Sequence, residues 1–201
     1  MKLRGYEWIE TTIISLKGEE KARKQQRCYY GADGKVQKVP IADAAPKAAP
    51  EPKGGGGGRR GGAKVKETII ENKKDDMKEY MERAGALIQQ YVPPSPEKIQ
   101  AVKDAGKLKV TPGDGGKVRL ELPDYVQPGD KLTIDINAAA NSMAGVNVAS
   151  YLDKKEDTVT LDVKFAALPD GTSYAGQTTL DAKAKNITVV TQNSGYRPVA
   201  K

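Results

Sequence analysis

The sequence has no histidine, and its 201 residues include a single cysteine, Cys28. Without histidine the chain cannot form a Ser-His-Asp or Cys-His catalytic site, a histidine-ligated zinc site or a histidine general base. A single cysteine excludes a disulfide within the chain. Carboxylates are common, but most of them stand in predicted turns, where aspartate bonds its own backbone. We therefore predict that the protein is not an enzyme and has no metal site and no cofactor.

Long apolar runs and aromatic residues are also scarce. Hydrophobic residues make up 38% of the chain and aromatic residues 5%, and no apolar run approaches the roughly 20 residues of a membrane-spanning helix. Residues 1–5 lead straight into a strand-like segment without a signal-peptide pattern. The formal net charge is +7, which allows attraction to an anionic membrane surface. Because the lysines are spread along the chain, we interpret most of them as ordinary surface charge.

Two basic segments are candidates for nucleic-acid binding. Residues 21–27, KARKQQR, carry charge on both faces of a predicted strand, and the adjacent Tyr29 and Tyr30 point in opposite directions. A sheet that binds RNA needs exposed aromatic residues beside its charge. Residues 54–62, GGGGGRRGG, have no aromatic residue and no Gly-Lys-Ser/Thr ending that would bind phosphate. We therefore predict no nucleic-acid partner.

Apolar residues alternate with polar residues through the last third of the chain, from Lys117 to Thr191. A period of two places the two sets on opposite faces of a sheet, which predicts an antiparallel sheet with one apolar face and one wetted face. Similar segments at 6–16, 21–30 and 35–41 bring the expected number to about nine strands. The segment Asn193-Ser194-Gly195 is expected to end the sheet before a loose tail.

A three- and four-residue apolar period over 65–91 predicts an amphipathic helix, which Pro93 and Pro94 end. Ser95 is expected to cap a second helix that closes at Gly106. We predict an α+β fold, in which a strongly twisted antiparallel sheet forms an incomplete β-barrel and both helices pack on its concave face. The whole chain, 1–201, is one domain, and residues 42–64 are an Ala/Pro/Gly-rich flexible insert.

Several stretches resemble a group of bacterial exported proteins related to the outer-membrane lipoprotein carrier and sorting superfamily (LolA/LolB-like). They are YEWIETT with LKGEEKARKQ, CYYGADGKVQK, YVPPSPEKIQ, LPDYVQPGDKLTIDI, FAALPDGTSY and the closing Ile187-Thr188-Val189 with Asn193-Ser194-Gly195-Tyr196. The resemblance spans nearly the whole chain apart from the insert, and it implies a periplasmic protein whose export signal has been removed. In carriers of that fold, the half-barrel and its helices enclose an apolar cavity that takes up acyl chains.

The resemblance implies a similar cavity here, with a lipid or an acylated protein as partner and a monomeric carrier. Counting faces along the predicted elements assigns the cavity lining to Trp8, Leu132, Ile134, Leu161, Val163 and Phe165 from the sheet, and to Met77, Tyr80, Met81, Leu87 and Ile88 from the first helix. Methionine adapts well to an irregular apolar ligand. The alternative is a structural or protein-interaction domain of the same fold, with a filled core and no ligand.

Overall fold

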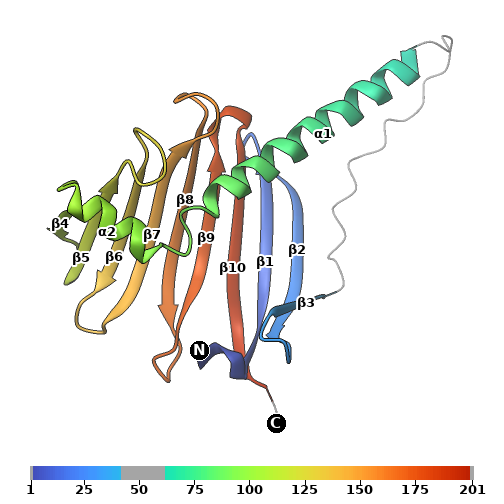
Figure 1. Cartoon of the computed structure of the whole chain (residues 1–201). Coiled ribbons are helices and arrows are strands. Elements are labelled where there is room, and N and C mark those ends of the chain that lie inside the picture. The colour runs from blue at the N-terminus through green and yellow to red at the C-terminus, as the bar shows by residue number, and fades with distance from the viewer. Residues whose placement is uncertain (1, 42–61, 200–201) are drawn as a thin grey trace.

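The computed structural model describes residues 2–41 and 62–199, and in this part of the chain it shows one open antiparallel sheet and two helices (Figure 1). The elements, in chain order, are η1 (Lys2–Gly5), β1 (Tyr6–Leu16), β2 (Glu19–Tyr30), β3 (Val36–Pro40), α1 (Gly62–Ile88), α2 (Pro96–Asp104), β4 (Lys109–Pro112), β5 (Lys117–Pro123), β6 (Lys131–Asn137), β7 (Ser142–Tyr151), β8 (Thr158–Ala167), β9 (Ser173–Ala182), η2 (Lys183–Lys185) and β10 (Ile187–Pro198).

The predicted antiparallel sheet with two helices is confirmed, and the described chain is mostly β with a minor helical part. The sheet has ten strands rather than about nine. Most of the predicted insert lies outside the described residues, although Gly62 to Lys64 already belong to α1. The expected break at Asn193–Gly195 is wrong, because β10 continues through it to Pro198. A bulge absorbs the irregular segment there, so that pairing with β1 resumes beyond it.

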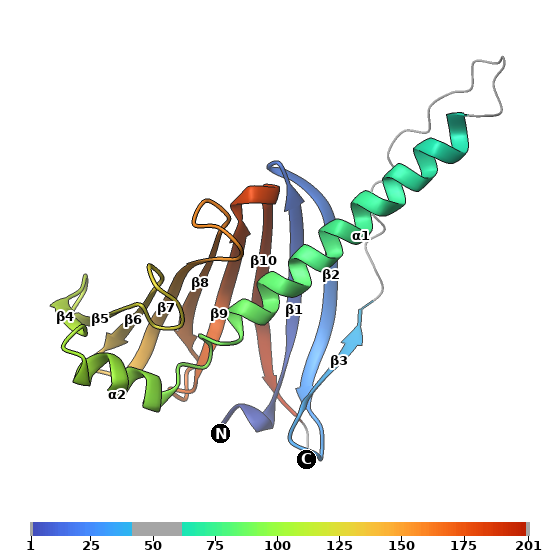
Figure 2. The same ribbon diagram turned by 45° about the horizontal axis from the view of Figure 1, so that its top comes forward.

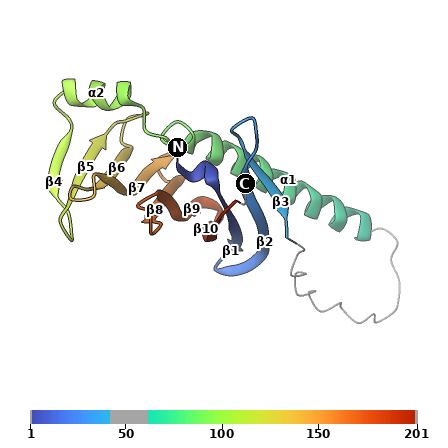
Figure 3. The same ribbon diagram turned by 90° about the horizontal axis from the view of Figure 1, so that it is seen from below.

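The strands follow the order β3-β2-β1-β10-β9-β8-β7-β6-β5-β4. The first strand of the chain therefore pairs with the last, as the third and fourth strands counted from β3, and the other neighbours are consecutive strands. Paired residues share a face. One row across the sheet contains Leu122, Leu132, Val148, Leu161, Leu180, Val189 and Ile14. We call the face that carries this row the helix face, because both helices lie on it (Figure 3).

The opposite face is polar. A neighbouring row there contains Arg119, Asp135, Gly145, Lys164, Gln177, Gln192 and Thr11. Arg119 and Asp135 form a bidentate pair, with nitrogen–oxygen distances of 2.8 and 3.0 Å. The alternation in the sequence thus corresponds to one face packed under helices and one face in water.

The helices bury the apolar rows of β5 to β8. Ala84 and Tyr91 are fully buried, and Val102 of α2 is 7% exposed, in one cluster with the sheet side chains. The Ser95 hydroxyl accepts a hydrogen bond from the Lys98 backbone N–H at 3.3 Å, which confirms the predicted cap of α2. The N-terminal half of α1 extends past β2, beyond the sheet (Figures 1 and 2).

A buried polar cluster joins the end of α1 to the loop between β5 and β6. Asp130 is 2% exposed, and its carboxylate accepts backbone N–H groups of Tyr125 at 2.6 Å, Val126 at 3.0 Å and Gln127 at 2.7 Å. It also accepts the hydroxyl of Tyr91. Because the Asp130 carboxylate accepts four hydrogen bonds, it holds the loop between β5 and β6 against the segment that follows α1.

Protonation of the Tyr91 phenol makes the stability of the folded protein depend on pH in the alkaline range. Burial, followed by the hydrogen bond to Asp130, raises the pKa of Tyr91 above its ordinary value of 10.0. Above pH 10 the unfolded chain therefore loses a proton that the folded chain keeps. Stability is complete below pH 10 and falls as pH rises above it, by up to about 1.4 kcal/mol per pH unit. In urea titrations from pH 8 to 11, the stability difference between the native protein and Y91F should shrink with rising pH, and a constant difference would contradict this.

Both edges of the sheet carry a proline. The Ile41 N–H bonds a β2 carbonyl at 3.0 Å, and the Gly113 N–H bonds a β5 carbonyl at 2.8 Å. Since bonded and non-bonded positions alternate in an antiparallel ladder, the preceding residues, Pro40 and Pro112, point their backbone nitrogens outward. Proline has no N–H, so each edge lacks a donor that an added strand would need.

Candidate functional site

An apolar groove lies between α1 and the sheet, where the helix crosses β10 and β1 (Figure 2). Its volume is about 370 Å³. The lining residues are Ile14, Ser15, Leu16, Lys21, Met77, Lys78, Met81, Ile187 and Val189. Ile14 remains 40% exposed, so one side of the groove is open to solvent. We call this site the α1 groove.

The sheet wall of the α1 groove depends on the pairing of β1 with β10. Leu16 stands opposite Ile187, and Ile14 stands opposite Val189, so four branched side chains form one patch on the helix face. Met77 and Met81 face this patch from α1, one helical turn apart. Methionine is flexible and polarizable, and it fills irregular gaps well. The groove thus combines a rigid wall from the sheet with an adaptable wall from the helix.

Two lysines flank this apolar surface. Lys21 Nζ lies 2.5 Å from Glu19, and Lys78 Nζ lies 3.9 Å from Glu82. The side chains of Lys21 and Lys78 are 49% and 75% exposed. Exposed ion pairs of this kind contribute little and exchange readily with solvent. Both ammonium groups can therefore turn to an anionic group at the mouth of the groove.

Polar contacts attach α1 beside the groove. The Tyr80 hydroxyl donates to the Asp157 carboxylate, and Arg83 donates to Asp153, both in the turn between β7 and β8. Tyr80 is 7% exposed. Burial, followed by the bond to Asp157, raises the pKa of Tyr80, so the phenol stays protonated and serves as a donor. These contacts position the helix and supply no acid–base pair.

The residues that the sequence assigned to one cavity lie in separate parts of the structure. Met77 and Met81 line the α1 groove, and Tyr80 packs in the small cluster at its inner side. A second set lies in the main core: Leu132, Ile134, Leu161, Val163 and Leu87 are buried there, and Phe165 and Ile88 pack against them. Sequence reasoning omitted Ile14, Leu16, Ile187, Val189 and the two lysines. Alternation did place Ile14 and Leu16 on the face of Trp8, but it gave no sign that β10 lies beside them.

Trp8 lies on the helix face, at the end of β1 away from α1. Its ring stacks on Tyr196 with centroids 5.5 Å apart and planes at 13°. The indole N–H donates to Asn193 at 3.1 Å, and Tyr30 packs at 5.8 Å. Trp8 is 7% exposed, so it belongs to a separate aromatic cluster rather than to the α1 groove.

Within residues 2–41 and 62–199, no three His, Cys, Asp or Glu side chains are grouped to hold a metal ion. Cys28 is buried beside the aromatic cluster, and burial raises the pKa of its thiol. In the same part of the chain, neither helix is long and apolar enough to cross a membrane. The α1 groove, with its apolar lining and two exposed lysines, is the candidate site.

Comparison with protein-family models, with curated proteins and with solved structures finds no match to this chain. The resemblance to the lipoprotein carriers therefore stays a hypothesis.

Proposed function

We propose that the protein is a non-enzymatic module that binds one acyl chain with an anionic headgroup in the α1 groove. The observation that carries this proposal is the pairing of an apolar lining with two rim lysines, Lys21 and Lys78. Ligand pockets in proteins usually enclose about 300–1,000 Å³, and the groove has about 370 Å³. Apolar walls suit the methylene chain, and the ammonium groups suit a carboxylate or phosphate at its end.

The chain length of the ligand sets the affinity. Each buried methylene contributes about 0.8 kcal/mol, which corresponds to about fourfold in affinity. Association costs several kcal/mol, so short acyl chains bind weakly and longer ones bind measurably until the groove is full. Affinity should therefore rise stepwise with chain length and then level off.

The wider proposal follows the resemblance to lipoprotein carriers. The ten strands would form an incomplete, strongly twisted barrel, and the helices would cover its concave face as in those carriers. The partner would be a lipid or an acylated protein in the periplasm, and the protein would act as a monomer. The basic charge would favour contact with an anionic membrane surface.

A second function is favoured by the main core. Leu132, Val148 and Val159 are fully buried beneath the helices, in the region that the resemblance would make hollow. A structural or protein-interaction domain needs only such a filled interior. The two functions differ in one respect, because the structural domain takes up no acyl ligand.

The test is delipidation followed by addition of dodecanoate, with binding measured by native mass spectrometry and calorimetry. We expect the native protein to bind one dodecanoate, and I14D and M81D to bind it at least about tenfold more weakly, because each puts a charge on an apolar wall. Neutral dodecanol should bind more weakly than dodecanoate, since it cannot use Lys21 and Lys78.

The matched control is M143D, which places the same charge at an exposed methionine on β7, outside the groove. This variant should bind like the native protein. If the native protein takes up no dodecanoate, the acyl-binding function is wrong. If I14D and M81D bind as well as M143D, the ligand lies elsewhere and the α1 groove is not the site.

A further inference from the structure

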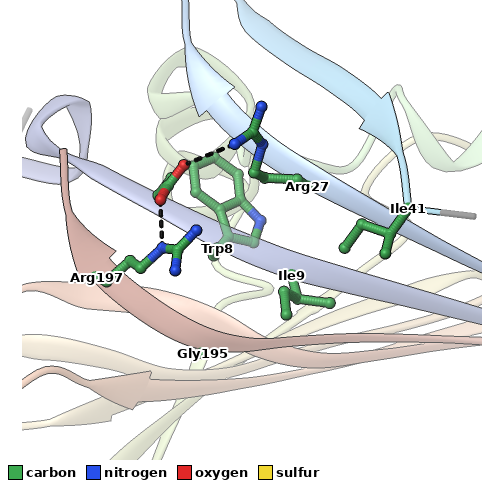
Figure 4. A pocket seen from close by; sticks show the side chains of 7 residues that line it. Trp8, Ile9, Arg27, Ile41, Gly195 and Arg197 are labelled. Atoms are coloured by element: carbon green, nitrogen blue, oxygen red, sulfur yellow. Dashed lines mark hydrogen bonds and ion pairs between the residues drawn. The ribbon is translucent and has the colours of Figure 1, made fainter.

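A smaller pocket lies on the polar face of the sheet, near the start of β1 (Figure 4). Its lining consists of Glu7, Trp8, Ile9, Arg27, Ile41, Gly195 and Arg197, and its volume is about 120 Å³. This is well above the roughly 10–15 Å³ that a cavity needs in order to hold one water molecule. Glu7 and Ile9 alternate with Trp8 along β1, so the pocket and the α1 groove are on opposite faces.

A β-bulge shapes the pocket. The pairing of β1 with β10 shifts register between Glu7 and Ile9, opposite Gly195. Gly195 has φ +63°, a conformation that other residues adopt only with strain. A Cβ at this position would make an ordinary contact with Ile9 Cδ1 at 3.7 Å, so the backbone conformation rather than lack of space favours glycine here. The bulge brings Arg197 opposite Glu7.

Two guanidinium groups share one carboxylate in this pocket. Arg197 donates to Glu7 through Nε, and Nη1 of Arg27 lies 3.9 Å from Glu7, which is too long for a hydrogen bond. Among the described residues, the terminal nitrogens of Arg197 and the guanidinium of Arg27 have no hydrogen-bond acceptor. Glu7 is 18% exposed, while the arginine side chains are 67% and 47% exposed. The pocket therefore keeps one positive charge in excess and several unused donors.

We propose that this pocket binds a small carboxylate with a short aliphatic group. Arginine presents parallel N–H donors that match the two oxygens of a carboxylate. Ile9 and Ile41 lie together on one side of Arg27 and offer an apolar surface for the aliphatic group (Figure 4). A single negative charge on the ligand neutralises the one positive charge that remains after Glu7 has offset one of the two arginines. The site is independent of the α1 groove, and its failure would leave acyl binding untouched.

Trp8 gives a local signal for this test, because it is the only tryptophan of the chain and stands between Glu7 and Ile9 of the pocket on β1. Butyrate is the probe and butyramide is its neutral control. Trp8 fluorescence and the NMR shift of its indole N–H should change saturably with butyrate over a millimolar range and stay constant with butyramide. R27Q and R197Q should weaken binding at least about tenfold, since each removes a charged donor. R27K keeps the positive charge but loses the paired N–H donors of the guanidinium. Its affinity for butyrate should therefore lie between those of R27Q and the native protein.

Two further variants separate a binding site from a structural ion pair. R23Q removes the same charge from the same strand and face, but Arg23 pairs with Glu20 at 2.9 Å, so butyrate should bind R23Q as it binds the native protein. E7Q should tighten binding severalfold, because it removes the carboxylate that competes for the arginines. Equal binding of butyramide, an equal loss in R23Q and R27Q, or weaker binding in E7Q would each overturn the proposal. Circular dichroism should give the same spectrum for each variant as for the native protein, which checks that the variants are folded.

Discussion

Replacing Asp130 with alanine is expected to lower the free energy of unfolding by about 4 kcal/mol. The carboxylate is 2% exposed and accepts three backbone N–H groups together with the Tyr91 hydroxyl. Alanine would remove the acceptor of the buried Tyr125 N–H and of the part-buried Val126 and Gln127 N–H groups, and it would leave the Tyr91 hydroxyl with Ser150 alone at 2.8 Å. Each group left without a partner costs about 1–3 kcal/mol unless water reaches it. Urea unfolding at neutral pH, followed by far-ultraviolet circular dichroism, measures the loss.

Asp114 provides the matched control, because it is exposed in the loop between β4 and β5. D114A should stay within about 0.5 kcal/mol of the native protein. D130N should fall between D130A and the native protein, since an amide offers one acceptor oxygen but also brings an extra donor into a site already filled with donors. A loss in D130A no larger than that in D114A would show that the loop and α1 hold together without the aspartate.

The second large effect is expected for Leu132, which is fully buried in the main core. L132A should lower the free energy of unfolding by about 3–4 kcal/mol, because it removes buried methylenes and leaves a cavity. M81A, in the half-buried wall of the α1 groove, should cost less than about 1 kcal/mol, since part of that side chain already faces solvent.

This comparison distinguishes a filled interior from a hollow one. In a carrier with an open cavity beneath both helices, L132A would lower the free energy of unfolding only slightly, because the substitution would remove no tight packing. If urea unfolding gives similar small losses for L132A and M81A, the interior is loosely packed and the cavity predicted from the resemblance regains support. A large loss at Leu132 alone would show that the interior beneath the helices is filled, so that an acyl chain on the helix face could enter only the α1 groove.

The local parts of the fold were predictable because the signals are local. Alternation from Val118 to Phe165 assigned side chains to faces, and the Ser95-Pro96 pair marked the start of α2. The pairing of β1 with β10 was not predictable in this way, since it joins Tyr6 to Pro198 across almost the whole chain. That pairing brings Ile14 and Val189 together. No local pattern in the sequence therefore indicated the sheet wall of the α1 groove.

The candidate site was predicted only on its helical side for the same reason. Periodicity showed that Met77, Met81 and Leu87 lie on the apolar side of one helix, but it gave no helix path across the sheet. The structure docks Leu87 against the core and Met81 beside β1 and β10, so neighbours on one helix have different surroundings. Periodicity also cannot separate a packed apolar face from one that lines a space.

The prolines at the two margins of the sheet have a consequence for how the molecule meets others. Each margin is a poor template for a further ribbon, so chains crowded at high concentration have little tendency to join into a shared fibre through their backbones. Recognition is left to side chains on the broad surfaces, where selectivity depends on shape and charge. Both proposed sites lie on those surfaces, one on each side of the same sheet.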